Sequence, residues 1–234
     1  MEGSRRVYDY SCTNRDIGKG ITMYQYIFWD WNGTIIDDVD VALNAVNRML
    51  QKRAYPVITL QRYRELMDTP IIRFYKPIFD LDKYPFEEIA DEFQRLYQKG
   101  NPQPYSEVPN LIQQFWKQGR HQIVLSSSER QSIQILSDAL GFLDYFDAIL
   151  GADDIYALSK VERAVDYLQR EGIMPEQCVI IGDTVHDYEV AHSMGIACVL
   201  LACGHDDEKS LRQCGCPVCE NHQELFEIDS LGNL

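Results

Sequence analysis

Two acidic motifs lie far apart in the chain, and each carries carboxylates that could bind a divalent cation. The first covers residues 30–34 (Asp-Trp-Asn-Gly-Thr) and the second covers residues 182–187 (Gly-Asp-Thr-Val-His-Asp). Carboxylate oxygens are the hard ligands that Mg²⁺ prefers, and Mg²⁺ in turn binds phosphate groups. If the two motifs meet in the fold, they therefore predict a site for Mg²⁺ and a phosphoryl group.

An apolar run precedes each motif and predicts a buried strand. Residues 26–29 (Tyr-Ile-Phe-Trp) come before the first motif, and residues 178–181 (Cys-Val-Ile-Ile) come before the second. In an open parallel sheet, ligands bind outside the carboxyl ends of the strands. Side chains just beyond these two runs are therefore expected to converge.

The carboxylates of the two motifs suggest distinct roles in phosphoryl transfer. Hydrolysis of a phosphate ester requires an in-line nucleophile and positive charge around the transferred oxygens. Asp30 lies at a strand end and is the predicted nucleophile, which would form an aspartyl-phosphate. The predicted ligands of Mg²⁺ are the carboxylates of Asp30, Asp183 and Asp187 and the backbone carbonyl of Asn32.

Further residues are predicted to contact the phosphoryl group or to shape the loop around it. Gly33 allows the backbone to turn closely around the phosphoryl group, and the hydroxyl of Thr34 can fix the loop. Ser126 follows a predicted strand and offers a hydroxyl, with Ser127 as a neighbouring donor. Lys160 begins a predicted helix and supplies a positive charge that separates the carboxylates electrostatically.

The composition argues against partners of large negative charge. The 234 residues include 36 acidic and 22 basic ones, and the formal net charge of −14 opposes binding to nucleic acids and anionic membranes. No apolar run approaches the roughly 20 residues that span a bilayer, and the first residues lack the apolar stretch of a secretory signal. The seven scattered cysteines favour reduced thiols. We therefore expect a soluble, cytoplasmic protein, monomeric or homodimeric, that acts on a small phosphorylated metabolite.

The periodicity of the chain changes near residue 105. Helical spacing dominates residues 39–99, whereas strands and helices alternate from about residue 105 onwards. This order predicts an α/β fold, with a Rossmann-like parallel sheet core interrupted after its first strand by an all-α helical insert. The predicted boundaries are a disordered arm at 1–22, a core at 23–38 and 105–234, and the insert at 39–104. In the second part we predict helices at 110–118, 129–140, 160–170 and 187–194, and strands at 121–125, 148–150, 178–181, 197–201 and 217–219.

The order of these motifs resembles that of the haloacid dehalogenase superfamily. The shared pattern is Asp-x-x-Gly-Thr, a strand-end serine, a lysine, and Gly-Asp-x-x-x-Asp. The helical insert resembles the small C1-type cap of the phosphoglycolate phosphatase-like and β-phosphoglucomutase-like branch. The resemblance covers about residues 23–231. It implies hydrolysis of phosphoric monoesters through an aspartyl-phosphate, with Mg²⁺ as cofactor and a mobile cap that closes over the substrate.

One position departs from the pattern of this family. Its phosphatases usually carry a second aspartate two residues after the nucleophile, which protonates the leaving group and then activates water, whereas this chain has Asn32. General acid–base help of this kind is worth roughly 10²–10⁴-fold in rate. Substrates with good leaving groups, such as acyl or aryl phosphates or a pyrophosphate, would need less protonation. Alternatively, Asp37, Asp38 or His186 could act as a substitute base.

Because Asn32 replaces the usual aspartate, the sequence is also compatible with other functions. A phosphometabolite-binding or regulatory protein could keep the metal site without turnover, and a mutase or phosphonatase relative is another alternative. Phosphonate-cleaving members of the superfamily use a small residue at the position of Asn32 together with a cap lysine. Lys52 and Lys76 lie in the insert but in no recognisable motif. Dehalogenases are less similar, because they carry an aromatic residue at this position and need no metal.

Two further groups of residues suggest ligands. Arg73 lies where related caps place their substrate-specificity loop and could bind a carboxylate or a second phosphate of the substrate. Residues 203–219 contain one histidine and four cysteines, a composition found in zinc sites. Their Cys-x-Cys-x-x-Cys spacing lacks a paired second knuckle, so a zinc site is not predicted.

Overall fold

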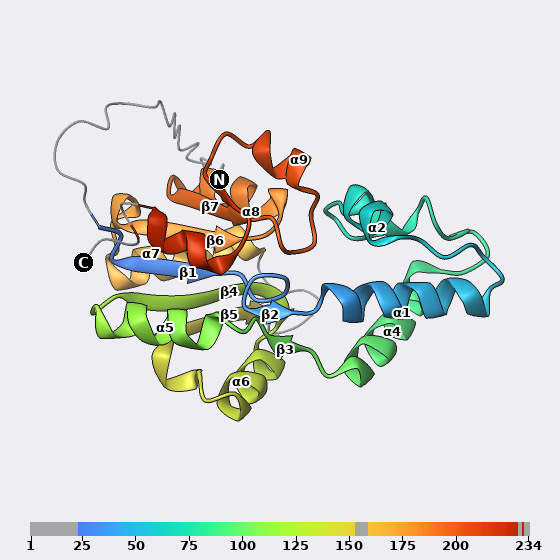
Figure 1. Ribbon diagram of the computed structural model, residues 1–234, viewed down its shortest axis with the longest axis horizontal. Coiled ribbons are helices and arrows are strands. Elements are labelled where there is room, and N and C mark those ends of the chain that lie inside the picture. Colours follow the sequence, from blue (N-terminus) through green and yellow to red (C-terminus); the bar gives the residue numbers. More distant parts are fainter. Residues whose placement is uncertain (1–22, 153–158, 229–230, 232–234) are drawn as a thin grey trace, which may run out of the picture.

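A central sheet of six parallel strands forms the core of the computed structural model, which describes residues 23–152, 159–228 and 231 (Figure 1). The strands lie in the order β5-β4-β1-β6-β7-β8, and every neighbouring pair is parallel. The predicted Rossmann-like α/β fold is therefore confirmed, while the predicted arm at 1–22 lies outside the described residues. The strands are β1 (Tyr26–Trp29), β4 (His121–Glu129), β5 (Ala148–Ala152), β6 (Cys178–Gly182), β7 (Ala197–Leu201) and β8 (Val218–Cys219).

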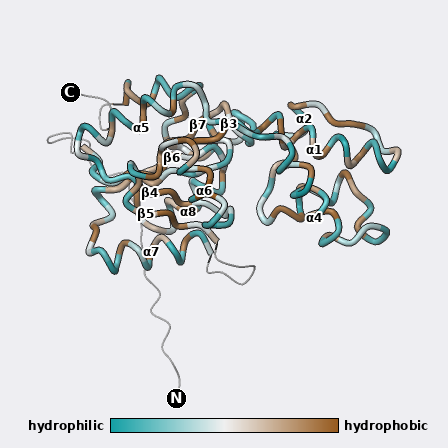
Figure 2. Tube along the Cα trace, turned by 90° about the horizontal axis from the view of Figure 1, so that it is seen from below, coloured by the Kyte–Doolittle hydropathy of each residue, from teal (hydrophilic) through white to brown (hydrophobic). Residues whose placement is uncertain are grey.

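Helices cover both faces of this sheet. In β1, Ile27 and Trp29 pack into one apolar core and Phe28 packs into the other, and all three side chains are fully buried. Burial on both faces explains why the strands are continuous apolar runs instead of alternating patterns. Figure 2 shows α5 and α7 on opposite sides of the strands. The helices of the first face are α5 (Val108–Lys117) and α6 (Arg130–Ala139), and those of the second are α7 (Lys160–Glu171), α8 (Val185–Met194) and α9 (Glu208–Arg212).

A helical lobe extends from one end of the sheet (Figure 1). It has an apolar core of its own, built around Val46, Met49, Phe74 and Ile89, each at most 1% exposed. Two short antiparallel strands, β2 (Ile36–Asp37) and β3 (Gln103–Pro104), lie where the chain enters and leaves the lobe. The helices of the lobe are α1 (Val39–Lys52), α2 (Leu60–Leu66), α3 (Ile72–Tyr75) and α4 (Phe86–Tyr97). Short 3₁₀ helices follow at Gln98–Gly100, Leu143–Tyr145, Pro175–Gln177 and His222–Glu227.

Several element boundaries differ from the sequence-based predictions. β4 continues to Glu129, although we expected it to end at Leu125, so the three serines at 126–128 belong to this strand. Its pairing with β5 shifts register beyond Leu125, which shows that the extension is irregular. The strands β2 and β3 were not predicted, because two residues each are too few to establish a period.

The strand order brings the ends of three strands together. β1 lies between β4 and β6, at the point where the chain reverses its direction across the sheet. Ligand sites of open α/β sheets lie at such switch points. The amide of Asp30 extends the pairing of β1 by donating to the carbonyl of Ile181, at 2.9 Å. Residues at the ends of β1 and β6 are thereby fixed relative to one another.

Candidate active site

Three carboxylates meet at the carboxyl ends of β1 and β6. Asp30 follows β1, Asp183 follows β6, and Asp187 lies in the first turn of α8. One oxygen from each lies within 4.8 Å of the others, and among the described residues this is the one group of three or more metal-binding side chains. The convergence predicted from the two motifs is thus present in the geometry.

A buried lysine joins two of these carboxylates. The Lys160 ammonium lies 2.7 Å from Asp30 Oδ1 and 2.5 Å from Asp187 Oδ1, and its side chain is 5% exposed. Lys160 is the first residue of α7, whose preceding Ser159 forms a capping box with Glu162. Because the cap fixes where the helix begins, it also fixes the position of the ammonium group.

Burial and charge set the pKa values of the cluster. Burial raises the pKa of Asp30 to about 6 despite the nearby ammonium of Lys160. Burial also raises the pKa of Asp183 well above its ordinary value. For Asp187, burial acts in the same direction, but Lys160 and the hydrogen bonds from Thr184 outweigh it and lower the pKa. The cluster of carboxylates therefore favours an additional positive charge next to Asp30 and Asp183.

The carboxylate of Asp183 is held from two sides. Thr34 Oγ1 donates to one oxygen at 2.9 Å, and the amide of His205 donates to the other at 2.7 Å. Gly33 has a φ of 71°, and a Cβ atom there would collide with the Asp183 carboxylate and the His205 ring. The amide of Gly33 donates to Asp38. Gly33 and Thr34 thus support the carboxylates of Asp38 and Asp183, and their expected contact with the substrate stays a prediction.

The donor set fits a magnesium ion. Asp30, Asp183 and Asp187 all offer carboxylate oxygens, the ligand type that Mg²⁺ prefers. A divalent cation would also stabilise the charged forms of Asp30 and Asp183, whose pKa values are raised first by burial and then by the neighbouring carboxylates. The predicted fourth ligand, the carbonyl of Asn32, belongs to the turn that follows β1.

The side chain of Asn32 is held by three hydrogen bonds. Its Nδ2 donates to Asp38 Oδ2 and to the hydroxyl of Tyr97, both at 2.8 Å. Its Oδ1 accepts from Ser128 Oγ at 2.6 Å. Both amide hydrogens are thus engaged, and neither can pass to a leaving group, so the structure supplies no acid at this position.

Asp38 is the central acceptor of this network. Its carboxylate accepts from the amide of Gly33 at 2.7 Å, His205 Nε2 at 3.1 Å, the Tyr97 hydroxyl at 2.7 Å and Asn32 Nδ2 at 2.8 Å. Burial disfavours its charge, but the bonds from His205, Tyr97 and Asn32 outweigh burial and lower its pKa. Asp38 therefore stays ionised near neutral pH and cannot donate a proton to a leaving group, while its role as a substitute base stays a prediction.

His205 connects this network to the helical lobe. Its Nδ1 lies 2.9 Å from the hydroxyl of Tyr63 in α2, while its Nε2 faces Asp38. Burial alone would lower the pKa of His205, but Asp38 raises it to about 9. Nearby, the guanidinium of Arg64 donates to the carbonyls of Cys203 and Gly204, at 2.8 and 2.9 Å. Both ring nitrogens of His205 are thus occupied by protein groups.

Sequence reasoning gave little weight to these residues. Asp38 precedes α1, where an aspartate usually caps the helix, yet its side chain makes no capping hydrogen bond. Its partners Tyr97 and His205 lie 59 and 167 residues away. The sequence did carry one signal, the adjacent pair Asp37-Asp38. A helix cap needs only one carboxylate, so the second is available for another role.

The three serines of β4 face different surroundings. Ser126 is buried, and its Oγ accepts from the amide of Ser128 at 3.1 Å. Ser127 is exposed and lines a cleft between the sheet and the lobe. Ser128 holds Asn32, as described above. Ser127 is therefore the serine placed to meet a molecule in the cleft.

The cleft has a volume of about 640 Å³ and is bounded by both parts of the molecule. Thr184 and Val185 of the core lie on one side, and Arg64 and Arg73 of the lobe lie on the other. The guanidinium of Arg73 donates to the carbonyl of Thr69 at 2.9 Å and lies 3.5 Å from Asp68. Arg73 thus lines the cleft, although an acidic neighbour offsets part of its charge.

The sequence itself is similar to a known protein family. The model of haloacid dehalogenase-like hydrolases matches residues 27–201, well over half of the chain. The chain belongs to the haloacid dehalogenase-like hydrolases. The family and the enzyme class predicted from the sequence are thereby confirmed.

Relatives and solved structures within this superfamily agree with the assignment. The chain is 24% identical over 196 residues to a 5′-nucleotidase of Pseudomonas aeruginosa, covering 81% of this chain and 87% of the relative. It is 25% identical over 207 residues to a phosphoglycolate phosphatase of Synechococcus elongatus, covering 87% and 96%. A haloacid dehalogenase-like family hydrolase from Streptococcus pneumoniae superposes with a TM-score of 0.75 at 21% identity, covering 87% of this chain and 97% of that one. No helix among the described residues is long and apolar enough to cross a membrane.

Proposed function

We propose that this hydrolase cleaves a small phosphoric monoester in the presence of Mg²⁺, through an aspartyl-phosphate on Asp30. The observation that carries the proposal is the cluster of Asp30, Asp183 and Asp187 around one point, with Lys160 bridging two of them. The names of the relatives support the choice of a phosphate ester as substrate.

In the first step, an oxygen of Asp30 attacks the phosphorus atom and the bond to the leaving oxygen breaks. Asp30 is suited to this role because it follows β1 directly and its side chain retains 13% exposure, more than those of Lys160 and Asp187. Lys160 holds the carboxylate in place and balances the charge of the incoming group. The ion would add positive charge at the transferred oxygens, with Asp30, Asp183, Asp187 and the Asn32 carbonyl as its ligands.

In the second step, water attacks the phosphorus atom and the bond to Asp30 breaks, which releases phosphate and restores the carboxylate. An aspartate at position 32 would assist both steps by donating and then recovering a proton. Asn32 cannot, because its amide is bound to Asp38, Tyr97 and Ser128. The leaving group must therefore depart with little protonation, and the water step is expected to be slow.

The helical lobe, with boundaries at residues 39 and 104, would act as the cap of this enzyme. Tyr63 and Arg64 of α2 and Tyr97 of α4 contact the core through His205, the loop at 203–204 and Asp38. These contacts hold the lobe over the carboxyl ends of the strands. A cap in this position excludes bulk water from the phosphoryl group.

Phosphate release tests the proposal directly. The purified chain should release phosphate from a panel of acyl, aryl and alkyl phosphates with Mg²⁺ and stop when the metal is chelated. Asp30→Asn should lower the rate by about 10³-fold or more, whereas Asp40→Asn, an exposed aspartate of α1, should keep it. Binding of substrates without release would instead support a phosphometabolite-binding protein.

A further inference from the structure

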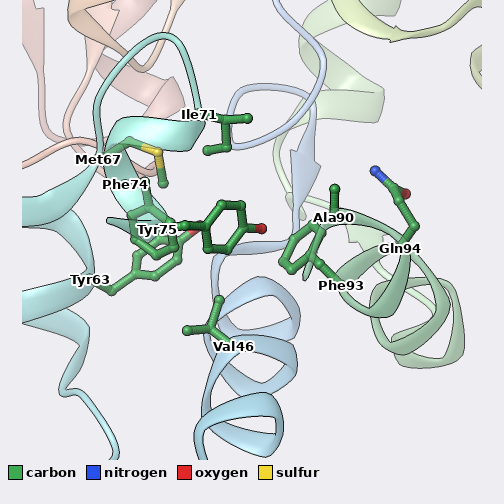
Figure 3. Close-up of a pocket in the computed structure, with 9 residues that line it drawn as sticks. All are labelled: Val46, Tyr63, Met67, Ile71, Phe74, Tyr75, Ala90, Phe93 and Gln94. Atoms are coloured by element: carbon green, nitrogen blue, oxygen red, sulfur yellow. The ribbon is translucent and has the colours of Figure 1, made fainter. Parts of the chain in front are cut away.

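The helical lobe contains an aromatic cavity of its own, beside the cleft that faces the sheet. It has a volume of about 130 Å³, and Figure 3 shows rings around it, from Tyr63, Phe74, Tyr75 and Phe93. No charged side chain lines it. Burying a charge away from water costs much more than burying an apolar group, so these walls favour an uncharged, flat occupant.

The cavity does not reach the reacting groups. Neither the carboxylates of the acidic cluster nor Asn32 lines it. In its wall, Phe93 stacks on Tyr97 with 5.7 Å between ring centroids, and Tyr97 in turn contacts Asn32. On another side, the hydroxyl of Tyr63 contacts the ring of His205. A ring in this cavity therefore cannot be attached directly to the phosphoryl group, and the candidate occupant is a separate molecule.

The volume of the cavity fits one aromatic ring. An apolar cavity of about 150 Å³ that is lined by Leu, Ile and Phe side chains stays free of water and binds benzene. The cavity in the lobe is of similar size, at about 130 Å³. Its aromatic walls can also contact a bound ring edge-on or in an offset stack, which adds to the gain from burial.

One polar group inside the cavity has no partner. Tyr75 is 3% exposed, and its hydroxyl makes no hydrogen bond within the part of the chain that the structure describes. Figure 3 shows this hydroxyl pointing toward Ala90 and Phe93. Burial raises the pKa of Tyr75, so the hydroxyl stays neutral and can donate or accept a hydrogen bond. A ligand with a hydroxyl group would therefore satisfy a buried group that is otherwise unpaired.

Two apolar side chains offer a route into the cavity. Met67 and Ile71 line both the cavity and the cleft. Ile71 is 44% exposed, so its side chain is not fixed by packing on all sides. A small molecule can thus enter from the cleft while the core of the lobe stays folded.

We propose that the cavity binds a small phenol, a single aromatic ring with one hydroxyl group, as a ligand separate from the substrate. The ring would lie between Tyr63 and Phe93, and its hydroxyl would form a hydrogen bond with that of Tyr75. Tyr63 also contacts His205 of the core, so the occupant would share a side chain with the junction between lobe and core. The site goes beyond the proposed hydrolysis and does not depend on it.

Two probes of similar size test the site, because they differ in the hydroxyl group. The protein is titrated with 4-fluorophenol and with 4-fluorotoluene, without Mg²⁺ or substrate, and binding is followed by fluorine NMR. Fluorophenol should saturate one site per chain with a Kd of about 1 mM or below. Tyr75→Phe should weaken its binding by about 3- to 10-fold, the value of one hydrogen bond, and leave that of fluorotoluene nearly unchanged. Tyr84→Phe, in the lobe but outside the cavity wall, is the matched control.

A second variant tests the location of the site. Ala90→Phe places a ring inside the cavity and should weaken both probes by 10-fold or more, whereas Gln51→Phe, on the exposed side of α1, should leave both unchanged. Should Ala90→Phe fail to fold, Ala90→Leu fills part of the same space.

Three results would overturn the proposal. They are an absence of saturation by fluorophenol up to about 10 mM, binding that persists when position 90 is filled, and equal losses of the two probes in Tyr75→Phe. None of these measurements involves release of phosphate. Failure of the cavity to bind a phenol is therefore distinguishable from failure of the proposed function.

Discussion

The acidic cluster at the sheet and the aromatic cavity in the lobe are built from different kinds of contact. At the sheet, Asp30, Asp183 and Asp187 are held by charge and by backbone groups at the ends of β1 and β6. In the lobe, the cavity walls are packed rings such as Phe74 and Phe93, and no charge is present. Under the proposed function, the sheet would perform the chemistry and the lobe would cover it as a cap.

Between the two regions lies a network that joins them. Asp38 accepts hydrogen bonds from Asn32 and His205 of the core and from Tyr97 of the lobe. The comparison therefore predicts three graded effects: changes in the acidic cluster should damage stability and chemistry most, changes at Asn32 should alter the kind of substrate, and changes at His205 should show mainly in stability.

Lys160→Met is expected to have the largest effect. It removes the cation between two buried carboxylates and leaves Asp30 and Asp187 facing each other without compensation. Breaking a buried ion pair in this way costs about 3–5 kcal/mol. Chemical denaturation of the metal-free protein measures the loss, with Lys209→Met, an exposed lysine of α9, as control. Equal stability of the two variants would contradict the description of the cluster.

Asn32→Asp should shift the substrate preference. The new carboxylate would lie beside Asp38, and this proximity of like charges raises the pKa of the pair, so that a proton is retained near neutral pH. The variant should then hydrolyse alkyl phosphates up to about 10²-fold faster, since it can protonate their leaving groups. Rates on aryl phosphates should change much less. A uniform change on both ester types would show that protonation does not limit this enzyme.

His205 should make stability depend on pH in the alkaline range. Its pKa is about 9 in the folded protein, above the ordinary value of 6.5. A raised folded pKa means that the protonated ring stabilises the fold fully below pH 6.5, and that this contribution is lost as the pH rises through 9. Between pH 7 and 9.5 the metal-free protein should lose about 2 kcal/mol.

His205→Gln isolates this contribution. The variant keeps a hydrogen-bond donor for Asp38 but cannot titrate, so its stability should be nearly flat over the same interval. His121→Gln changes an exposed histidine that pairs with Asp147 and should behave like the unmodified protein. Parallel pH profiles of unmodified protein and His205→Gln would contradict the assigned charge of this ring.

The sequence predicts the sheet and its acidic cluster because both follow local rules. The strands β1 and β6 are unbroken apolar runs, and each is followed directly by an aspartate, so the strand ends can be read from the chain. Lys160 could be predicted for the same reason, since Ser159 and Glu162 mark the start of α7. Strand ends and helix starts can be predicted from neighbouring residues alone, without knowing which distant side chains they contact in the fold.

The network around Asn32 could not be predicted in this way. His205 is separated from Asp38 by 167 residues and lies in a segment whose cysteines suggested a different chemistry. The short helix α3 could not be predicted either, because its four residues are too few to show a helical period. Its residues Phe74 and Tyr75 are nevertheless part of the buried core of the lobe. These residues acquire their roles only through tertiary packing.

Trapping the phosphorylated enzyme tests the central claim most directly. The protein is mixed with Mg²⁺ and an aryl phosphate, quenched in acid within the first turnovers, digested and examined by mass spectrometry. Because Asn32 provides no base for the water step, the aspartyl-phosphate should accumulate, and the phosphoryl group should be found on Asp30 and be absent from Asp30→Asn. A phosphoryl group on another residue, or Mg²⁺-dependent release of phosphate that persists in Asp30→Asn, would contradict the account.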